Sequence, residues 1–154
     1  MKYKKMDHYF NESIDIIIDK ILYLSSLTVS DVRLDISVNK FSEELGVVCH
    51  FLCDFFCAPH YYRWKCTSTR IMKDHMLYEK RLATATKKFV PTAVLLSKIN
   101  PKDIRKFIVD LQGKYEGEIH FYNDLTFSYY VCNSVISMIL ENIIKNERIS
   151  VQAI

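Results

Sequence analysis

Apolar residues recur with a helical period along most of this chain of 154 residues. In the first such stretch, from about Asp7 to Leu24, they are three or four positions apart and form one stripe: Phe10, Ile14, Ile17, Ile18 and Ile21. The same period returns from about Asn39 to Cys57, between the hydroxyl residues at 67–69 and Pro91, and from Asn100 to Gly113. This spacing predicts amphipathic helices that each bury one face.

Two further segments depart from that pattern. From Asn123-Asp124 to about Lys145 the chain is apolar nearly all round, which is typical of a helix at the centre of a bundle. Between Thr28 and Val38, apolar and polar residues partly alternate, and this alternation predicts a short strand or an extended connector.

These elements together predict an all-α fold, a single bundle of five to six helices around the apolar C-terminal helix. We expect the domain to cover residues 1–148 and residues 149–154 to form a loose tail. The chain has only three glycines and three prolines, which disfavours folds with many tight hairpins and excludes glycine-rich phosphate loops. Globin-like, cyclin-like and Bcl-2-like arrangements all fit this pattern.

The cysteines and the longest uncharged run indicate the compartment. Of the five cysteines, Cys49, Cys53 and Cys57 have the spacing of helical neighbours, which favours reduced thiols and a cytoplasmic or nuclear protein. The longest uncharged run, Leu125 to Leu140, is shorter than the roughly 20 residues that span a bilayer. We therefore expect no membrane span.

Charge is distributed in blocks along the chain. Residues 63–106 carry twelve Lys and Arg against three Asp and Glu, whereas acidic residues predominate on both sides. This basic segment is a candidate surface for a protein partner, an anionic lipid surface or nucleic acid, unless it is a solvated face or the acidic flanks fold against it. The candidate binding residues are Arg63, Trp64, Lys65, Arg70, Lys73, Lys80, Lys87 and Lys88.

One constellation has the residue types of a metal site. Cys49, Cys53 and Cys57 are spaced by four residues, so two of their thiolates point to one side of a helix. His60 or Cys66 is then available to complete a tetrahedral zinc site. His75 lies on the apolar stripe of its helix and is interpreted as a packed histidine.

No catalytic signature of a hydrolase, kinase or dinucleotide-binding enzyme is present in the sequence. The pattern therefore favours a non-enzymatic regulatory module without catalytic residues or cofactor, which accepts a partner helix in a groove. Abundant isoleucine and scarce alanine suit an AT-rich genome such as that of a virus or parasite. The module is therefore interpreted as a viral or parasite host-interaction factor. The alternatives are a nucleic-acid-associated factor that uses residues 63–106 and a zinc protein built on the three cysteines; a homodimer is compatible with each.

Overall fold

The computed structural model describes residues 8–64, 68–91, 96–115 and 119–152. Within these ranges the protein is all-α, as the apolar periodicity predicts, and contains no strand. The elements are α1 (Phe10–Ser26), the π-helix η2 (Asp31–Ile36), α2 (Val38–Phe55), α3 (Ala58–Tyr61), α4 (Thr69–Thr86), the 3-10 turn η3 (Pro101–Asp103), α5 (Ile104–Lys114) and α6 (Phe121–Gln152).

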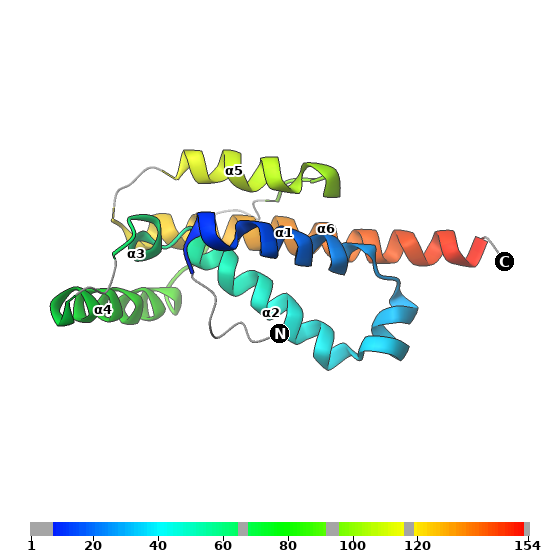
Figure 1. Ribbon diagram of the computed structural model, residues 1–154, viewed down its shortest axis with the longest axis horizontal. Coiled ribbons are helices and arrows are strands. Elements are labelled where there is room, and N and C mark those ends of the chain that lie inside the picture. The colour runs from blue at the N-terminus through cyan, green and yellow to red at the C-terminus, as the bar shows by residue number, and fades with distance from the viewer. Residues whose placement is uncertain (1–7, 65–67, 92–95, 116–118, 153–154) are drawn as a thin grey trace.

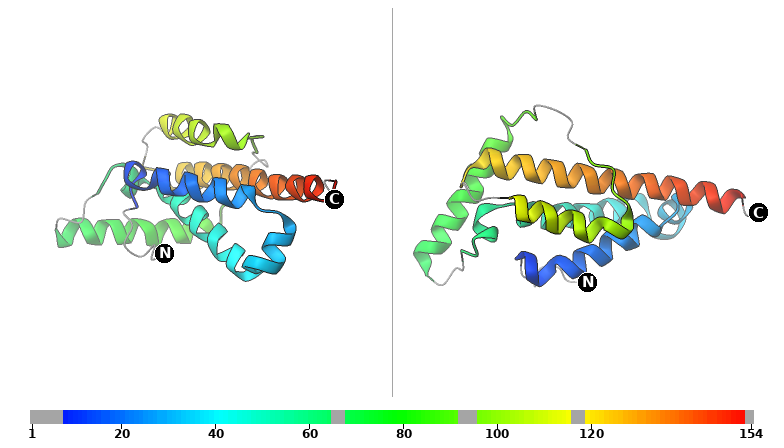
Figure 2. Two further views of the ribbon diagram at one scale, coloured as in Figure 1. Left: turned by 45° about the vertical axis from the view of Figure 1, so that its right-hand side comes forward. Right: turned by 90° about the horizontal axis from the view of Figure 1, so that it is seen from above.

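The helix α6 runs along the bundle, and α1 and α2 pack against it (Figure 1). The helix α5 lies beside the same bundle, while α4 crosses it at the end where α6 begins (Figure 2). The short helix α3 follows α2 directly, so the C-terminal end of α2, α3 and α4 meet at this one end of the molecule.

The core is made by the stripes that the sequence predicts. The buried face of α1 includes Ile14, Ile17 and Ile21, and α6 contributes fully buried Val131 and Val135. By contrast, Tyr78 is the one buried residue of α4. Because burial of apolar surface supplies most of the stability of a helix in a protein, α4 is held less firmly than α1, α2 and α6.

The prediction of an extended segment at 28–38 is wrong. Residues 29–36 are helical and only Thr28 and Ser37 interrupt the helices of this segment. Asp31 accepts hydrogen bonds from the backbone N–H and the hydroxyl of Thr28. The Asp31 N–H in turn donates to the Thr28 hydroxyl, as in a capping box. Local side-chain bonds of this kind favour a helical start, and they outweigh a partial alternation of apolar residues.

Helix starts follow the polar residues that mark them in the sequence. The Ser68 hydroxyl accepts a hydrogen bond from the Ile71 N–H at the start of α4, within the expected stretch of hydroxyl residues. Asn100 likewise accepts from the Lys102 N–H before η3 and α5. Pro59 stands in the first turn of α3, where a missing N–H costs nothing.

Among the described helices, α6 alone is long and apolar enough to cross a membrane by length and composition. A central helix of a soluble bundle has the same composition, and the α6 residues Val131, Val135 and Ile139 have no exposed surface.

Candidate metal centre

The first half of the candidate centre is built around the last turns of α2. His50 and Asp54 are four residues apart, so the helix places both side chains on one side. Asp54 Oδ2 lies 3.5 Å from His50 Nε2 and 2.6 Å from Nδ1 of His8, which precedes α1. These three side chains bring their donor atoms within 4.8 Å of one another.

The second half comes from α3 and α4. His75 and Glu79 repeat the four-residue spacing on α4, with 2.9 Å between His75 Nε2 and Glu79 Oε1. His60 on α3 brings its Nε2 to 3.2 Å from the same carboxylate oxygen. This second set is as compact as the first.

Asp54 joins the two sets into one centre. While its Oδ2 faces His8 and His50, its Oδ1 lies 3.7 Å from Nε2 of His60. The rings of His60 and His75 are 4.9 Å apart and those of His8 and His60 are 5.9 Å apart. Four imidazoles and two carboxylates therefore converge at the end of the bundle where α2, α3 and α4 meet.

The donor set fits zinc. Imidazole nitrogen and carboxylate oxygen are both ordinary zinc ligands, and each set supplies three, the number that leaves a catalytic zinc an open position. A ligating imidazole must be unprotonated, and burial lowers the pKa of His60 despite the neighbouring Asp54 and Glu79.

A buried carboxylate on α6 holds the elements that carry these ligands. Asp124, 1% exposed, accepts hydrogen bonds from the Ala58 N–H (3.2 Å), the Tyr78 hydroxyl (2.8 Å) and the Tyr115 hydroxyl. Ala58 begins the helix of His60, and Tyr78 precedes Glu79. Burial raises the pKa of Asp124, and burial together with this carboxylate raises the pKa of both tyrosines.

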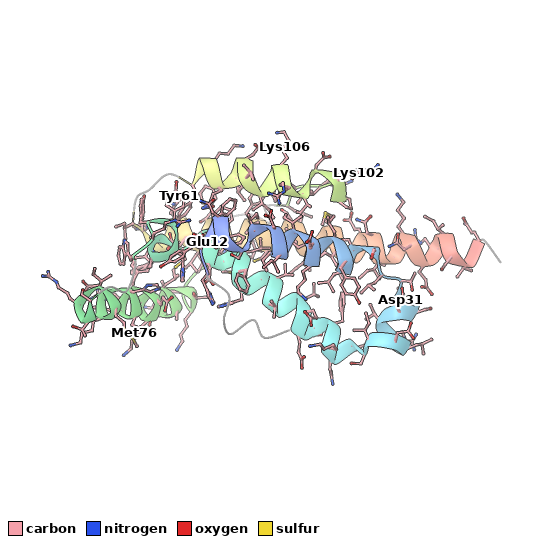
Figure 3. All side chains as sticks on the ribbon, viewed as in Figure 1. Glu12, Asp31, Tyr61, Met76, Lys102 and Lys106 are labelled. Atoms are coloured by element: carbon pink, nitrogen blue, oxygen red, sulfur yellow. The ribbon has the colours of Figure 1, made fainter. Side chains whose placement is uncertain are left out.

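A cavity of about 210 Å³ adjoins the centre and shares Asp54 and His60 with it. Its other lining residues combine aromatic and polar side chains: Phe10, Asn11, Phe55, Tyr61, Arg63 and Gln112. Arg63 has a left-handed backbone (φ 51°) and pairs with Glu12 of α1, which is labelled in Figure 3. Gln112 Oε1 is buried and has no hydrogen-bond partner among the described residues.

The structure does not bring the predicted basic residues into one site. Arg63 lines the cavity, whereas Trp64 packs against Tyr78 and Lys65 lies outside the described residues. The other candidates are exposed along α4 and in the turn that follows it: Arg70, Lys73, Lys80, Lys87 and Lys88.

Within the described residues, which leave out Cys66, the cysteines do not join either ligand set. Neither ligand set found in the described residues includes Cys49, Cys53 or Cys57. Cys53 Sγ instead lies 3.8 Å from Cys132 Sγ on α6, and Cys57 is buried with its pKa raised by that burial. Cys49 and Cys53 lie on the α2 face that packs on α6, while His50 and Asp54 face His8, and Asp54 also faces His60 on α3.

His75 is packed against His60 and hydrogen-bonded to Glu79, in line with its interpretation as a packed histidine, but the same contacts also make it a candidate ligand of the second set. The signal was present in the sequence. Two histidines each stand four residues before a carboxylate, His50 before Asp54 and His75 before Glu79, inside stretches predicted to be helical. His8 had no such signal, since its approach to α2 depends on tertiary packing.

A helical bundle that gathers these six donors beside a polar cavity has the donor set and the open space that a metal-dependent hydrolase requires. Consistent with this, the family model described as zinc dependent phospholipase C matches residues 1–122, and the chain belongs to this family. All six donors fall within the matched residues. No curated protein and no solved structure matched the chain.

Family membership overturns the functional prediction. The chain is not the non-enzymatic regulatory, Bcl-2-like viral module that its composition favoured, because it belongs to a family of enzymes. The zinc alternative was nearer. Reasoning from motifs failed here because an active site made of scattered histidines and carboxylates has no compact signature of the glycine-loop or serine-elbow kind.

Proposed function

We propose that this protein is a zinc-dependent phospholipase C, which hydrolyses the bond between phosphorus and the glycerol oxygen of a phospholipid. The observation that carries the proposal is the convergence of six zinc-type donors within the part of the chain that matches the family. The products are a diacylglycerol and a phosphorylated headgroup.

Two sets of residues would hold the metal. His8, His50 and Asp54 form one, and His60, His75 and Glu79 form the other, with the second oxygen of Asp54 facing His60. Bound zinc supplies a Lewis acid for the phosphate oxygens and lowers the pKa of water to near neutrality.

The side chains around the cavity position the substrate. Asn11 and Arg63 present N–H donors beside Asp54, where phosphate oxygens approach the centre. Phe10 and Tyr61 limit access of bulk water to the same space. The unpartnered Gln112 Oε1 offers an acceptor for a hydroxyl or ammonium group of the headgroup.

The test uses the full chain and its histidines. We expect the purified protein to bind zinc and to release a phosphorylated headgroup from phospholipid in mixed micelles. His75→Gln removes a donor of the second set, and His120→Gln is the matched control, because His120 is exposed and lies outside both sets. Zinc content is measured by elemental analysis and hydrolysis by phosphorus NMR.

The expected result is loss of zinc and at least a roughly hundredfold loss of hydrolysis for His75→Gln, with wild-type behaviour for His120→Gln. Zinc binding without hydrolysis of any phospholipid would overturn the proposed activity. Equal zinc content in the two variants would overturn the ligand assignment.

A further inference from the structure

The helix α4 presents to solvent an outward face on which cations and apolar side chains alternate. Its cations are Arg70, Lys73, Lys80, Arg81, Lys87 and Lys88, and its apolar members are Met72, Met76 and Leu77. Met76 is 63% exposed and lies on the side of α4 that faces away from the bundle (Figure 3). We call these nine residues the α4 face.

The cations of this face are not balanced within the fold. No described carboxylate forms an ion pair with any of the six. Of the two acidic residues of α4, Glu79 contacts His60 and His75, and the exposed Asp74, about 20° from Arg81 around the helix axis, offsets only one of the six cations. The acidic flanks of the chain therefore do not neutralise the basic segment in the described residues, and the face remains strongly positive.

The α4 face also borders the metal centre. At about 100° per residue, Met72 and Met76 project within about 60° of Glu79 around the helix axis. The cations Lys73, Lys80 and Lys87 follow on the far side of the two methionines. Passing around α4, one meets the zinc ligands, then exposed methionine, then lysine.

From these observations we propose that the α4 face docks the protein on an anionic phospholipid membrane. Lysine and arginine attract the negative charge of such a surface, and methionine side chains insert among the headgroups. The inference deepens the proposed function, on which it rests for the identity of the substrate. Docking through this face brings the metal centre to the membrane surface where phospholipid is found.

Lipid fits this face better than nucleic acid does. Proteins that bind single strands stack bases on exposed aromatic rings, and the α4 face has none. The nearby Trp64 packs its ring against Tyr78 instead. Exposed methionine and leucine among the lysines have no role in phosphate contacts but match a headgroup layer.

The test is sedimentation of the zinc-loaded full chain with vesicles. Vesicles of phosphatidylcholine alone are compared with vesicles that contain phosphatidylglycerol, across a series of salt concentrations. The Lys80→Glu/Lys87→Glu double variant reverses two cations of the α4 face. The matched control, Lys102→Glu/Lys114→Glu, makes the same charge change at exposed positions beside and within α5. Met72→Ser/Met76→Ser tests the apolar component.

We expect binding that requires phosphatidylglycerol and weakens with salt. Reversal on α4 should reduce it by roughly tenfold or more, the methionine variant should reduce it less, and the α5 control should leave it unchanged. Equal loss in the α5 control would show a nonspecific charge effect and overturn the proposal. Tighter binding to a labelled oligonucleotide in the same salt series would assign the face to nucleic acid.

Hydrolysis of a water-soluble, monomeric phosphodiester separates this proposal from the proposed function. If both proposals are correct, the α4 variants lose activity on vesicles and keep it on the soluble substrate. If neither substrate is hydrolysed by the wild type, the proposed function fails while the vesicle measurement still decides the docking surface. Unchanged zinc content confirms that each variant is folded around its centre.

Discussion

Asp124 shows how a single residue far from the ligands in sequence supports the centre. Its carboxylate accepts from Ala58, Tyr78 and Tyr115, so truncation leaves three buried donors without an acceptor. We expect Asp124→Ala to cost about 2–4 kcal/mol in the free energy of unfolding. We also expect it to weaken zinc binding, because α3 and α4 lose their common anchor.

Zinc affinity and urea unfolding measure the two effects, with Asp110→Ala as the control at an exposed position on α5. Asp124→Asn keeps one acceptor oxygen and should recover part of the zinc affinity. A stable Asp124→Ala variant with wild-type zinc affinity would contradict the positioning role.

The raised pKa of Asp124 makes a separate prediction about pH. Because burial raises its folded pKa above the unfolded value, the stability contribution of this group is complete at low pH and is lost as pH rises through the folded pKa. The wild type should therefore gain stability relative to Asp124→Asn between pH 7 and pH 4.5. Urea unfolding of both proteins in a chelator measures this difference, in which the titration of the histidines cancels. A difference that shrinks on acidification would contradict the burial of the charge.

At the scale of elements, the helices were predictable and their meeting point was not. The spacing of apolar residues and the capping residues predicted α1, α2, α4, α5 and α6, because both signals depend only on residues close in sequence. The π-helix at 31–36 was missed because the hydrogen bonds between Thr28 and Asp31 at its start favour a helix over the strand that the alternating pattern predicts. The pairs His50/Asp54 and His75/Glu79 were readable as helical neighbours, whereas their convergence depends on how α3 turns the chain after α2.

The cap of α4 offers a test of how this element controls the centre. Ser68→Ala removes the hydroxyl that accepts from Ile71 N–H and should cost about 1 kcal/mol of helix stability. Since α4 buries little and carries His75 and Glu79, we expect weaker binding of the second zinc and unchanged binding of the first.

Zinc titration by calorimetry resolves the two sites. The control is Ser37→Ala, which removes the cap of α2 at the end opposite to His50 and Asp54. Equal weakening of both zinc sites by Ser68→Ala would show that α4 does not act separately.

For the whole molecule, the ligands come from the segment before α1, from α2, from α3 and from α4, so zinc joins four parts of the chain at one end of the bundle. A ligand that binds only the folded state stabilises it by about 4 kcal/mol at a thousandfold excess over its Kd. Removal of zinc by a chelator should therefore lower Tm by roughly 8–15 °C in a chain of this length.

Differential scanning calorimetry with and without chelator measures this shift, and the control is the same treatment of His75→Gln, which has already lost a ligand and should respond less. The loss of stability on removal of zinc should also differ between the helices. Core residues of α1, α2 and α6 such as Ile17, Leu52 and Val135 are fully buried and do not contact the metal centre, whereas α4 buries only Tyr78. Hydrogen exchange should therefore accelerate first in α3 and α4 after chelation. Uniform acceleration across all helices would instead show that the centre and the core form one cooperative unit.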